Sequence, residues 1–208
     1  MRKVILQEFV SLDGRAAGAN DSVDFIPAAT KGDLTFGQGQ MALLDTIDTI
    51  LLGRVTYKMF ASYFPLVTEG DDKAFADKLN AIPKIVFSKT LTQAPWGKWD
   101  DATIVRRSPP QEVAALKQQS GKDIVVWGSI SVAQSLINEG LIDEYRLVVC
   151  PVVLGSGRAL FRDKADALDM TLLETKTHDR GSVLLKYEKG AAASTPAALP
   201  VPETASVH

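Results

Sequence analysis

The sequence predicts an α/β protein with a largely parallel central sheet. Apolar runs of strand length alternate with helical segments through most of the chain, which is the pattern of strand–helix–strand units. Two of the strands break at a glycine, Gly53 and Gly128, and pass at once into a helix. The last three strands have no helix between them, so we expect the sheet to end in antiparallel strands.

The expected elements follow one another in a regular order. Strands are expected at Val4–Val10, Thr49–Leu52, Lys84–Phe87, Thr103–Arg106, Ile124–Trp127, Glu144–Pro151, Met170–His178 and Ser182–Glu188. Helices are expected near Gln40–Asp45, from Arg54, near Asp72–Ala81, at Pro110–Gln119 and at Ser131–Glu139. The turn around Asp179-Arg180-Gly181 joins the last two strands as a hairpin.

The composition indicates one folded domain followed by a tail. Of the 208 residues, 46% are hydrophobic and 23% are charged, which is the balance of a globular protein. We expect one domain over residues 1–189. Residues 190–208 are rich in Ala, Pro, Ser and Thr and are expected to be disordered, because they offer little apolar surface to offset the entropy of ordering.

Charge and hydropathy exclude several partners. The net charge is −2 and no cluster of Lys and Arg is present, which argues against a nucleic-acid partner. No segment has the length of a membrane span or a signal peptide, so we expect a cytoplasmic protein.

The single cysteine and the histidine of the folded region are expected to be structural. Cys150 lies in an apolar run, which favours a buried thiol over a nucleophile. His178 lies in an expected edge strand beside a turn, which favours a surface position. No zinc-ligand spacing, nucleophile elbow or Gly-x-x-x-x-Gly-Lys loop is present, so no metal is expected.

The two strand–glycine–helix junctions predict anion sites. Unpaired N–H groups and the positive end of the helix dipole meet at such a junction, and glycine has no Cβ to keep a phosphate away from them. Arg54 and Thr56 add a guanidinium and a hydroxyl to the first junction. Carboxyl ends of parallel strands share one edge of a sheet, so the two junctions should lie together and bind a ligand with two phosphates, such as a dinucleotide. Each junction alone is equally consistent with a simple turn.

Three further loops could complete such a site. Ser88-Lys89-Thr90 suits a ribose or a 2′-phosphate, favouring NADP over NAD, or is a solvated loop whose hydroxyls cap the backbone. The glycine-rich segment 11–18 is a candidate flap over a nicotinamide ring or only a turn. Gly155-Ser156-Gly157-Arg158 either shapes a substrate pocket or turns the chain.

Five ordered segments resemble the dihydrofolate reductase-like superfamily, and within it the RibD C-terminal reductase domain of riboflavin biosynthesis. They are Ser11-Leu12-Asp13-Gly14-Arg15, Leu52-Gly53-Arg54-Val55-Thr56-Tyr57, Phe87-Ser88-Lys89-Thr90, Val126-Trp127-Gly128-Ser129 and Pro151-Val152-Val153-Leu154-Gly155-Ser156-Gly157. The resemblance covers about residues 2–188 and implies a three-layer fold with about eight strands, a homodimer, and NADPH lying across the carboxyl edge of the sheet.

The resemblance also implies roles for individual residues. Gly53, Arg54 and Thr56 would hold one phosphate, and Ser88, Lys89 and Thr90 the 2′-phosphate side. The pyrophosphate would lie against Gly128, Ser129, Ile130 and Ser131, and the nicotinamide against Phe9, Ala17 and Gly18. The dimer would use the apolar strand Glu144–Pro151, and the substrate would contact Phe25, Tyr57, Phe60 and Gly155.

The chain departs from this family at the substrate end. Dihydrofolate reductases carry an acid about sixteen residues before the glycine that matches Gly53, where this chain has Gly37 and Gln38, which argues against folate as the substrate. The riboflavin-pathway reductases have Asp-Asp-Pro soon after this strand, whereas this chain reads Arg54-Val55-Thr56-Tyr57.

The resulting hypothesis is an NADPH-dependent reductase of a small polar heterocycle or carbonyl compound, similar to 5-amino-6-(5-phosphoribosylamino)uracil reductase. Asp13, Asp24 and Tyr57 are the candidates for protonation or substrate contact, and water is an alternative proton source. The alternative is a catalytically inactive protein that binds a nucleotide or another small molecule at the same sites.

Overall fold

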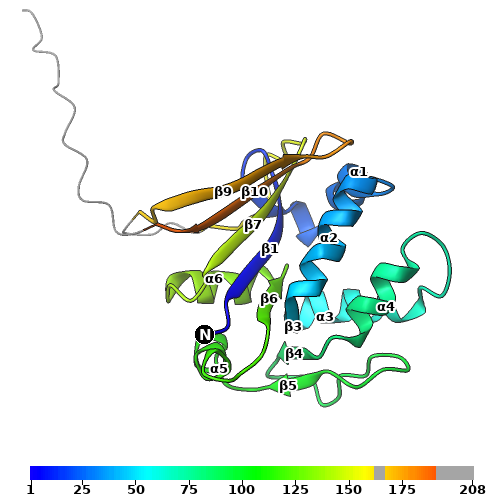
Figure 1. The fold of residues 1–208 in the computed structure, drawn as a ribbon, viewed down its shortest axis with the longest axis vertical. Coiled ribbons are helices and arrows are strands. Elements are labelled where there is room, and N and C mark those ends of the chain that lie inside the picture. The colour runs from blue at the N-terminus through cyan, green and yellow to red at the C-terminus, as the bar shows by residue number, and fades with distance from the viewer. Residues whose placement is uncertain (162–166, 191–208) are drawn as a thin grey trace, which may run out of the picture.

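A computed structural model describes residues 1–161 and 167–190, which form a mixed eight-stranded sheet with helices on both faces (Figure 1). The strand order is β5-β4-β3-β6-β1-β7-β10-β9. The bounds are β1 Val4–Ser11, β3 Ile47–Gly53, β4 Lys84–Phe87, β5 Thr103–Val105, β6 Asp123–Trp127, β7 Glu144–Cys150, β9 Met170–Thr177 and β10 Val183–Lys189. All pairs from β5 to β7 are parallel, and β10 is antiparallel to both neighbours, which confirms the predicted α/β class.

The helices form two layers around this sheet. The bounds are α1 Phe25–Thr30, α2 Leu34–Thr46, α3 Arg54–Ala61, α4 Lys73–Ala81, α5 Pro109–Lys117 and α6 Ile130–Asn138. Helices α5 and α6 pack on one face, and α2, α3 and α4 pack on the other (Figure 1). Strand β1 serves both layers because its side chains alternate: Leu6 and Val10 join the α5–α6 core, and Ile5 joins the other.

Helix α2 begins earlier than the expected Gln40–Asp45. Asp33 is its N-cap and accepts the Phe36 N–H at 2.9 Å, which fixes the start of the helix. Two glycines, Gly37 and Gly39, lie inside its first half and weaken the helical signal of the sequence.

A second, two-stranded sheet lies outside the predicted elements. Strand β2 (Arg15–Ala17) pairs with β8 (Arg158–Ala159), so the loop after β1 is covered by the loop after β7. The strands are two or three residues long, too short for hydrophobic alternation to reveal them.

The strand expected at a dimer interface, β7, is internal to the sheet. Strand β7 pairs with β1 on one side and β10 on the other, so it offers no free edge to a second copy. The edge strands of this sheet are β5 and β9, and on β9 Leu172 and Leu173 are 51% and 43% exposed. The tail expected at 190–208 lies outside the described residues except for Gly190, whose N–H donates to the Asp169 carbonyl.

The prediction for Cys150 is confirmed, and the prediction for His178 is wrong. Cys150 is fully buried, and burial raises the pKa of its thiol to about 11, which confirms a structural thiol. The surface position of His178 is wrong, because its ring is 7% exposed and packs edge-on against Phe36, with centroids 5.6 Å apart. Within the described residues, no helix combines the length and apolar character needed to cross a bilayer.

Candidate functional site

The two glycine bends touch each other at the carboxyl edge of the sheet. Strand β3 ends at Gly53 and continues directly into α3, and the neighbouring strand β6 reaches α6 through Gly128 and Ser129. The Gly53 N–H donates to Ser129 Oγ at 2.8 Å. A Cβ on Gly128 would lie 3.5 Å from Thr56 Cγ2. The expectation that the bends lie together is therefore confirmed.

The second bend presents free N–H groups at the start of α6. Gly128 and Ser129 both have left-handed backbone, with φ of +57° and +60°, so the chain turns sharply into the helix. The Val132 N–H donates back to the Ser129 carbonyl at 2.7 Å. No described residue accepts the N–H of Ile130 or Ser131. These two amides are the donors available to an anion.

At the first bend the side chains of Arg54 and Thr56 are available donors. The Gly53 amide is already used by Ser129, so it is not free to bind a phosphate. Arg54 is exposed and has no partner among the described residues, and Thr56 is half-buried beside Gly128. The guanidinium and the hydroxyl, not the glycine amide, are the groups that a phosphate could bind here.

A second cation, which sequence reasoning did not select, lies at the start of α6. Arg158 on β8 donates from Nη2 to Ser131 Oγ at 2.9 Å, and its Nη1 lies 3.4 Å from Asp21 Oδ1. The short strand pair β2–β8 brings it there, so its position depends on an element that the sequence did not reveal.

The Ser88 loop lies two strands away from the second bend along the same edge. Ser88 Oγ accepts the N–H groups of Thr90 and Leu91, at 3.2 and 3.0 Å, so this hydroxyl caps the backbone as the alternative interpretation expected. Arg106, at the end of β5, donates to the Ser88 carbonyl at 2.7 Å. Lys89 is exposed and unpartnered among the described residues, which leaves its ammonium free for an anion.

The residues expected around a nicotinamide ring lie on β1, where Phe9 is, and at the end of β2, where Ala17 and Gly18 are. Phe9, Ala17 and Gly18 are buried. Gly157 lies so close to this segment that a Cβ on it would be 2.1 Å from the Ala17 carbonyl oxygen. Phe25 packs against the small apolar cluster that contains Phe9.

Of the two acids named from the sequence, Asp13 is unsuited to donate a proton. Asp13 accepts hydrogen bonds from the Ser11 hydroxyl and from the Leu154 and Gly155 amides, and these lower its pKa to about 2. It therefore stays ionised and organises the loop that contains Gly155. Asp24 is exposed and accepts from the Ser22 hydroxyl at 2.8 Å.

Tyr57 and Phe60 belong to the core and not to a substrate surface. Tyr57 is 4% exposed, and its hydroxyl donates to the Pro95 carbonyl at 2.8 Å. Phe60 is 9% exposed and stacks edge-on with Phe64 and Trp127. Their helical spacing on α3 reflects core packing, so the substrate contacts expected of them do not fit the structure.

One buried carboxyl lies at the same edge and was not selected from the sequence. Glu8 on β1 is 3% exposed. Its Oε1 accepts the Phe9 N–H at 3.1 Å, and its Oε2 is buried with no partner among the described residues. Burial raises the pKa of this carboxyl to about 8, against the lowering effects of the Phe9 amide and Arg158. The signal in the sequence is a lone acid inside an apolar strand.

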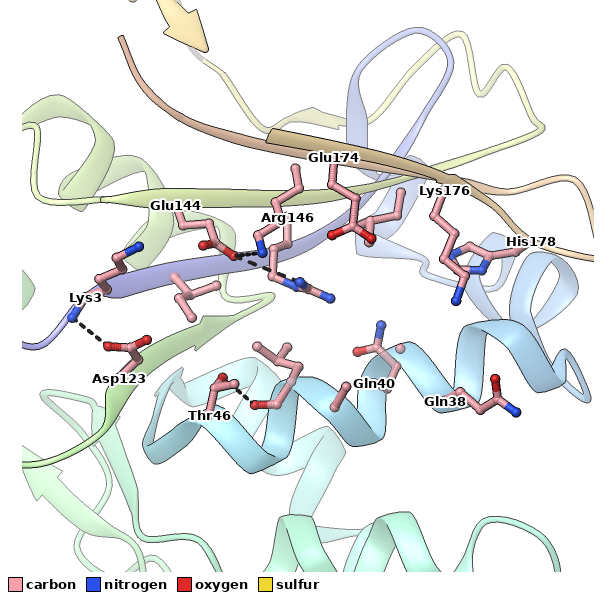
Figure 2. A pocket seen from close by; sticks show the side chains of 16 residues that line it. Lys3, Gln38, Gln40, Thr46, Asp123, Glu144, Arg146, Glu174, Lys176 and His178 are labelled. Carbon is pink, nitrogen blue, oxygen red and sulfur yellow. Dashed lines mark hydrogen bonds and ion pairs between the residues drawn. The ribbon is translucent and has the colours of Figure 1, made fainter. Parts of the chain in front are cut away.

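A polar cleft of about 480 Å³ lies between α2 and the sheet (Figure 2). Figure 2 shows Arg146 on β7 and Glu174 and Lys176 on β9 extending toward Gln40 on α2. The cleft is lined by Lys3, Ile5, Gln38, Gly39, Gln40, Ala42, Leu43, Thr46, Asp123, Glu144, Arg146, Glu174, Lys176, His178, Leu184 and Lys186.

Several polar atoms at this cleft lack complete hydrogen bonding. Arg146 is 8% exposed, and its Nε donates to Gln7 Oε1 at 3.3 Å. Its Nη1 lies 3.9 Å from Glu144 Oε1, and burial lowers its pKa. Gln40 Oε1, on a residue that lines the cleft, is buried without a partner among the described residues, and so is Nε2 of Gln7, which does not line the cleft but accepts from Arg146. A buried polar atom without a partner lowers the stability of the fold unless a ligand or a water molecule forms a hydrogen bond with it.

Aromatic side chains pack between the cleft and Phe9 on β1. His178 lines the cleft and packs on Phe36, and the Phe36 ring lies 5.8 Å from the Phe9 ring. In the described residues, no three His, Cys, Asp or Glu side chains gather as a metal-ligand set.

The fold and this edge define the class of protein: a dihydrofolate reductase-like α/β protein. Two solved structures share the fold. A putative riboflavin biosynthesis protein from Shewanella sp. PV-4 matches with a TM-score of 0.70 and 23% identity, over 92% of this chain and 100% of that chain. A diaminohydroxyphosphoribosylaminopyrimidine deaminase/5-amino-6-(5-phosphoribosylamino)uracil reductase from Thermotoga maritima matches with a TM-score of 0.63 and 13% identity, over 91% of this chain and 57% of that chain.

Sequence comparison gives the family. The RibD C-terminal domain family matches residues 2–184, and this chain belongs to it. The uncharacterized protein YyaP of Bacillus subtilis (strain 168) is 34% identical over 187 residues, which cover 89% of this chain and 94% of that protein. The resemblance drawn from the five sequence segments is therefore confirmed.

Proposed function

We propose that this protein is an NADPH-dependent reductase that transfers hydride to a small polar heterocycle or carbonyl compound. The single observation that carries the proposal is the contact between the two glycine bends, through the hydrogen bond from Gly53 to Ser129. That contact brings the start of α6, with its free amides, and the start of α3, with Arg54, to one edge, where we propose that one diphosphate binds. Membership of the RibD C-terminal domain family supports the same activity.

The residues along this edge fit a phosphorylated dinucleotide. Ile130 and Ser131 offer N–H groups for the pyrophosphate, with Arg54, Thr56 and Arg158 beside them. Lys89, with Ser88 and Thr90, would hold the 2′-phosphate, and Phe9, Ala17 and Gly18 would cover the nicotinamide. When bound, the dinucleotide supplies the hydride, and the protein supplies orientation and exclusion of water.

We further propose that the substrate occupies the polar cleft under α2. The unpartnered Gln7 amide nitrogen, the Gln40 amide oxygen and the Arg146 guanidinium could satisfy a small ring that carries both donors and acceptors. His178, which lines that cleft, packs on Phe36, and Phe36 packs on Phe9, the residue proposed to cover the nicotinamide.

Two titrations test this function. NADPH binding, followed by quenching of tryptophan fluorescence, should be weakened in Arg54→Ala by about tenfold or more, because a charge-assisted phosphate contact contributes about 1.5–3 kcal/mol. Lys89→Ala should weaken NADPH binding and leave NADH binding unchanged, since only NADPH carries the 2′-phosphate. Unchanged NADPH affinity in both variants would contradict the proposed site.

An inactive binding protein is the alternative that the geometry also supports, because hydrogen bonds lower the pKa of Asp13 to about 2 and keep this candidate proton donor ionised. Absorbance of the reduced nicotinamide, followed against panels of pterins, pyrimidines and carbonyl compounds, separates the two. Oxidation of NADPH with one of these compounds supports the reductase; tight binding without oxidation across the panels supports the alternative.

A further inference from the structure

We propose that Glu8 holds a proton in the resting protein and that its Oε2 donates a hydrogen bond to an acceptor oxygen at the nicotinamide end of the bound dinucleotide. This inference rests on the proposed function, because it concerns the same edge of the sheet. Glu8 would bind the ligand only while its own carboxyl is protonated.

The end of strand β6 leaves a gap beside β1, and Glu8 fills part of it. Strand β1 pairs with β6 only as far as Gln7 and Trp127, and the Gln7 carbonyl accepts the Gly128 N–H at 3.0 Å. In a parallel ladder, groups two residues further along point to the same side. The Phe9 N–H therefore points into the gap, where Glu8 Oε1 accepts it at 3.1 Å in place of a strand.

The second carboxyl oxygen of Glu8 has no hydrogen-bond partner among the described residues. Oε2 is buried and no described residue donates to it or accepts from it. An ionised oxygen in this position would be both desolvated and unpaired, which is strongly unfavourable. The neutral carboxyl avoids that charge and turns the unpartnered atom into an O–H donor that still needs an acceptor. A ligand oxygen in the gap would supply it.

The surroundings of Glu8 keep the proton. Strand β7 places Leu147 opposite Glu8, and helix α6 contains no ionisable residue. Arg158 on β8 is the charged group of the described residues that acts on Glu8, and it is already engaged by Ser131 and Asp21. The attraction of Arg158 is therefore smaller than the cost of burial, and burial raises the pKa of Glu8 to about 8.

The proposal predicts a specific pH dependence of binding. Only neutral Glu8 can donate this hydrogen bond to the ligand. NADPH affinity should therefore fall by about tenfold between pH 7 and pH 9, because a carboxyl with a pKa of about 8 loses its proton in that interval. The 2′-phosphate does not add to this change, since its second ionisation lies at about pH 6.

Two substitutions at the same position isolate the donor. In Glu8→Gln the amide nitrogen keeps a donor but cannot titrate, so its NADPH affinity should match the wild type within about threefold at pH 7 and stay flat to pH 9. Glu8→Leu has no donor, and its affinity should be about tenfold lower at pH 7 and equally flat. Fluorescence titration of NADPH into each protein measures these values, and circular dichroism checks the fold.

A readout on the unliganded protein completes the test. Infrared difference spectroscopy should show a protonated carboxyl band in the wild type at pH 7 that disappears through pH 8 and is absent in Glu8→Gln. Absence of this band at pH 7, or an equal pH dependence of NADPH affinity in wild type and Glu8→Gln, would overturn the inference while the reductase proposal stands. Failure of NADPH to bind at any pH would overturn both.

Discussion

The Ser129 hydroxyl accepts the Gly53 N–H at 2.8 Å and donates to the Trp127 carbonyl at 3.1 Å. One side chain thus joins two bends that lie 76 residues apart in the sequence. It also holds the free amides of α6 beside α3. The arrangement of the candidate phosphate site therefore depends on a serine whose own backbone is left-handed.

Substitution of Ser129 should separate the hydrogen bond from the backbone strain. Ser129→Ala should lower the free energy of unfolding by about 1–2 kcal/mol, because it leaves the partly buried Gly53 N–H unpaired. Ser129→Gly loses the same bond but should be about 1 kcal/mol more stable than Ser129→Ala, since glycine adopts a φ of +60° without a Cβ penalty. Urea unfolding measures both values. If Ser129→Ala were as stable as the wild type, the hydrogen bond from Gly53 to Ser129 would not contribute to the stability of the fold.

The contact of Gly157 with β2 gives a second prediction, with Gly155 as the matched control. A Cβ on Gly157 would lie 2.1 Å from the Ala17 carbonyl oxygen and 2.7 Å from the Gly18 carbonyl carbon, so backbone must move. Gly155 also has a positive φ, +70°, but no atom lies within 4 Å of its Cβ position.

Gly157→Ala should therefore lower the free energy of unfolding by at least about 2 kcal/mol and weaken NADPH binding, because β8 must move away from β2. Gly155→Ala should cost about 1 kcal/mol of backbone strain and leave NADPH binding intact. Thermal unfolding and NADPH titration test this pair. Equal effects of the two substitutions would mean that backbone strain, and not the contact with Ala17, accounts for the loss of stability and of NADPH binding.

The polar cleft gives a prediction on catalysis. Gln40→Leu removes the buried unpartnered oxygen, so it should raise KM for the substrate by about tenfold, the effect of one lost hydrogen bond of about 1.4 kcal/mol. Stability should be unchanged or higher, because an unsatisfied polar atom is replaced by an apolar group. Gln38→Leu is the control, since Gln38 lines the cleft but is exposed. Steady-state kinetics with the compound found in the panels give KM; equal values for Gln40→Leu and wild type would exclude the cleft as the substrate site.

Glu8 also predicts how stability changes with pH. Its pKa is raised by folding from 4.5 to about 8, so its contribution to stability is fully present below about pH 4.5 and is lost as the pH rises through about 8. Glu8→Gln has no such contribution to lose. The free energy of unfolding of Glu8→Gln relative to wild type should therefore increase between pH 5 and pH 8, by up to about 1.4 kcal/mol per pH unit. Urea unfolding at pH 5, 6.5 and 8 measures this difference; parallel curves for the two proteins would contradict it.

The fold could be predicted from the sequence because local patterns and topology agree. Continuous apolar runs such as Ile124–Trp127 indicate buried parallel strands, and a glycine directly before a helix indicates the end of such a strand. The carboxyl edge follows from these two features, since parallel strands place their ends together.

The site was predicted less completely, for physical reasons that concern particular residues. Arg158 reaches Ser131 only through the short β2–β8 pair, which carries no periodic signal. Phe60 and Tyr57 have the aromatic character of a binding surface, but the same spacing on α3 serves the core. The importance of Glu8 depends on where β6 ends relative to β1, a register that no single strand encodes.

The crystal structure of this protein with bound NADPH tests the central claim most directly. We expect pyrophosphate oxygens within hydrogen-bond distance of the Ile130 or Ser131 N–H, with the Arg54 guanidinium nearby and the 2′-phosphate beside Lys89. A dinucleotide bound away from the start of α6, or none bound at saturating NADPH, would contradict the account.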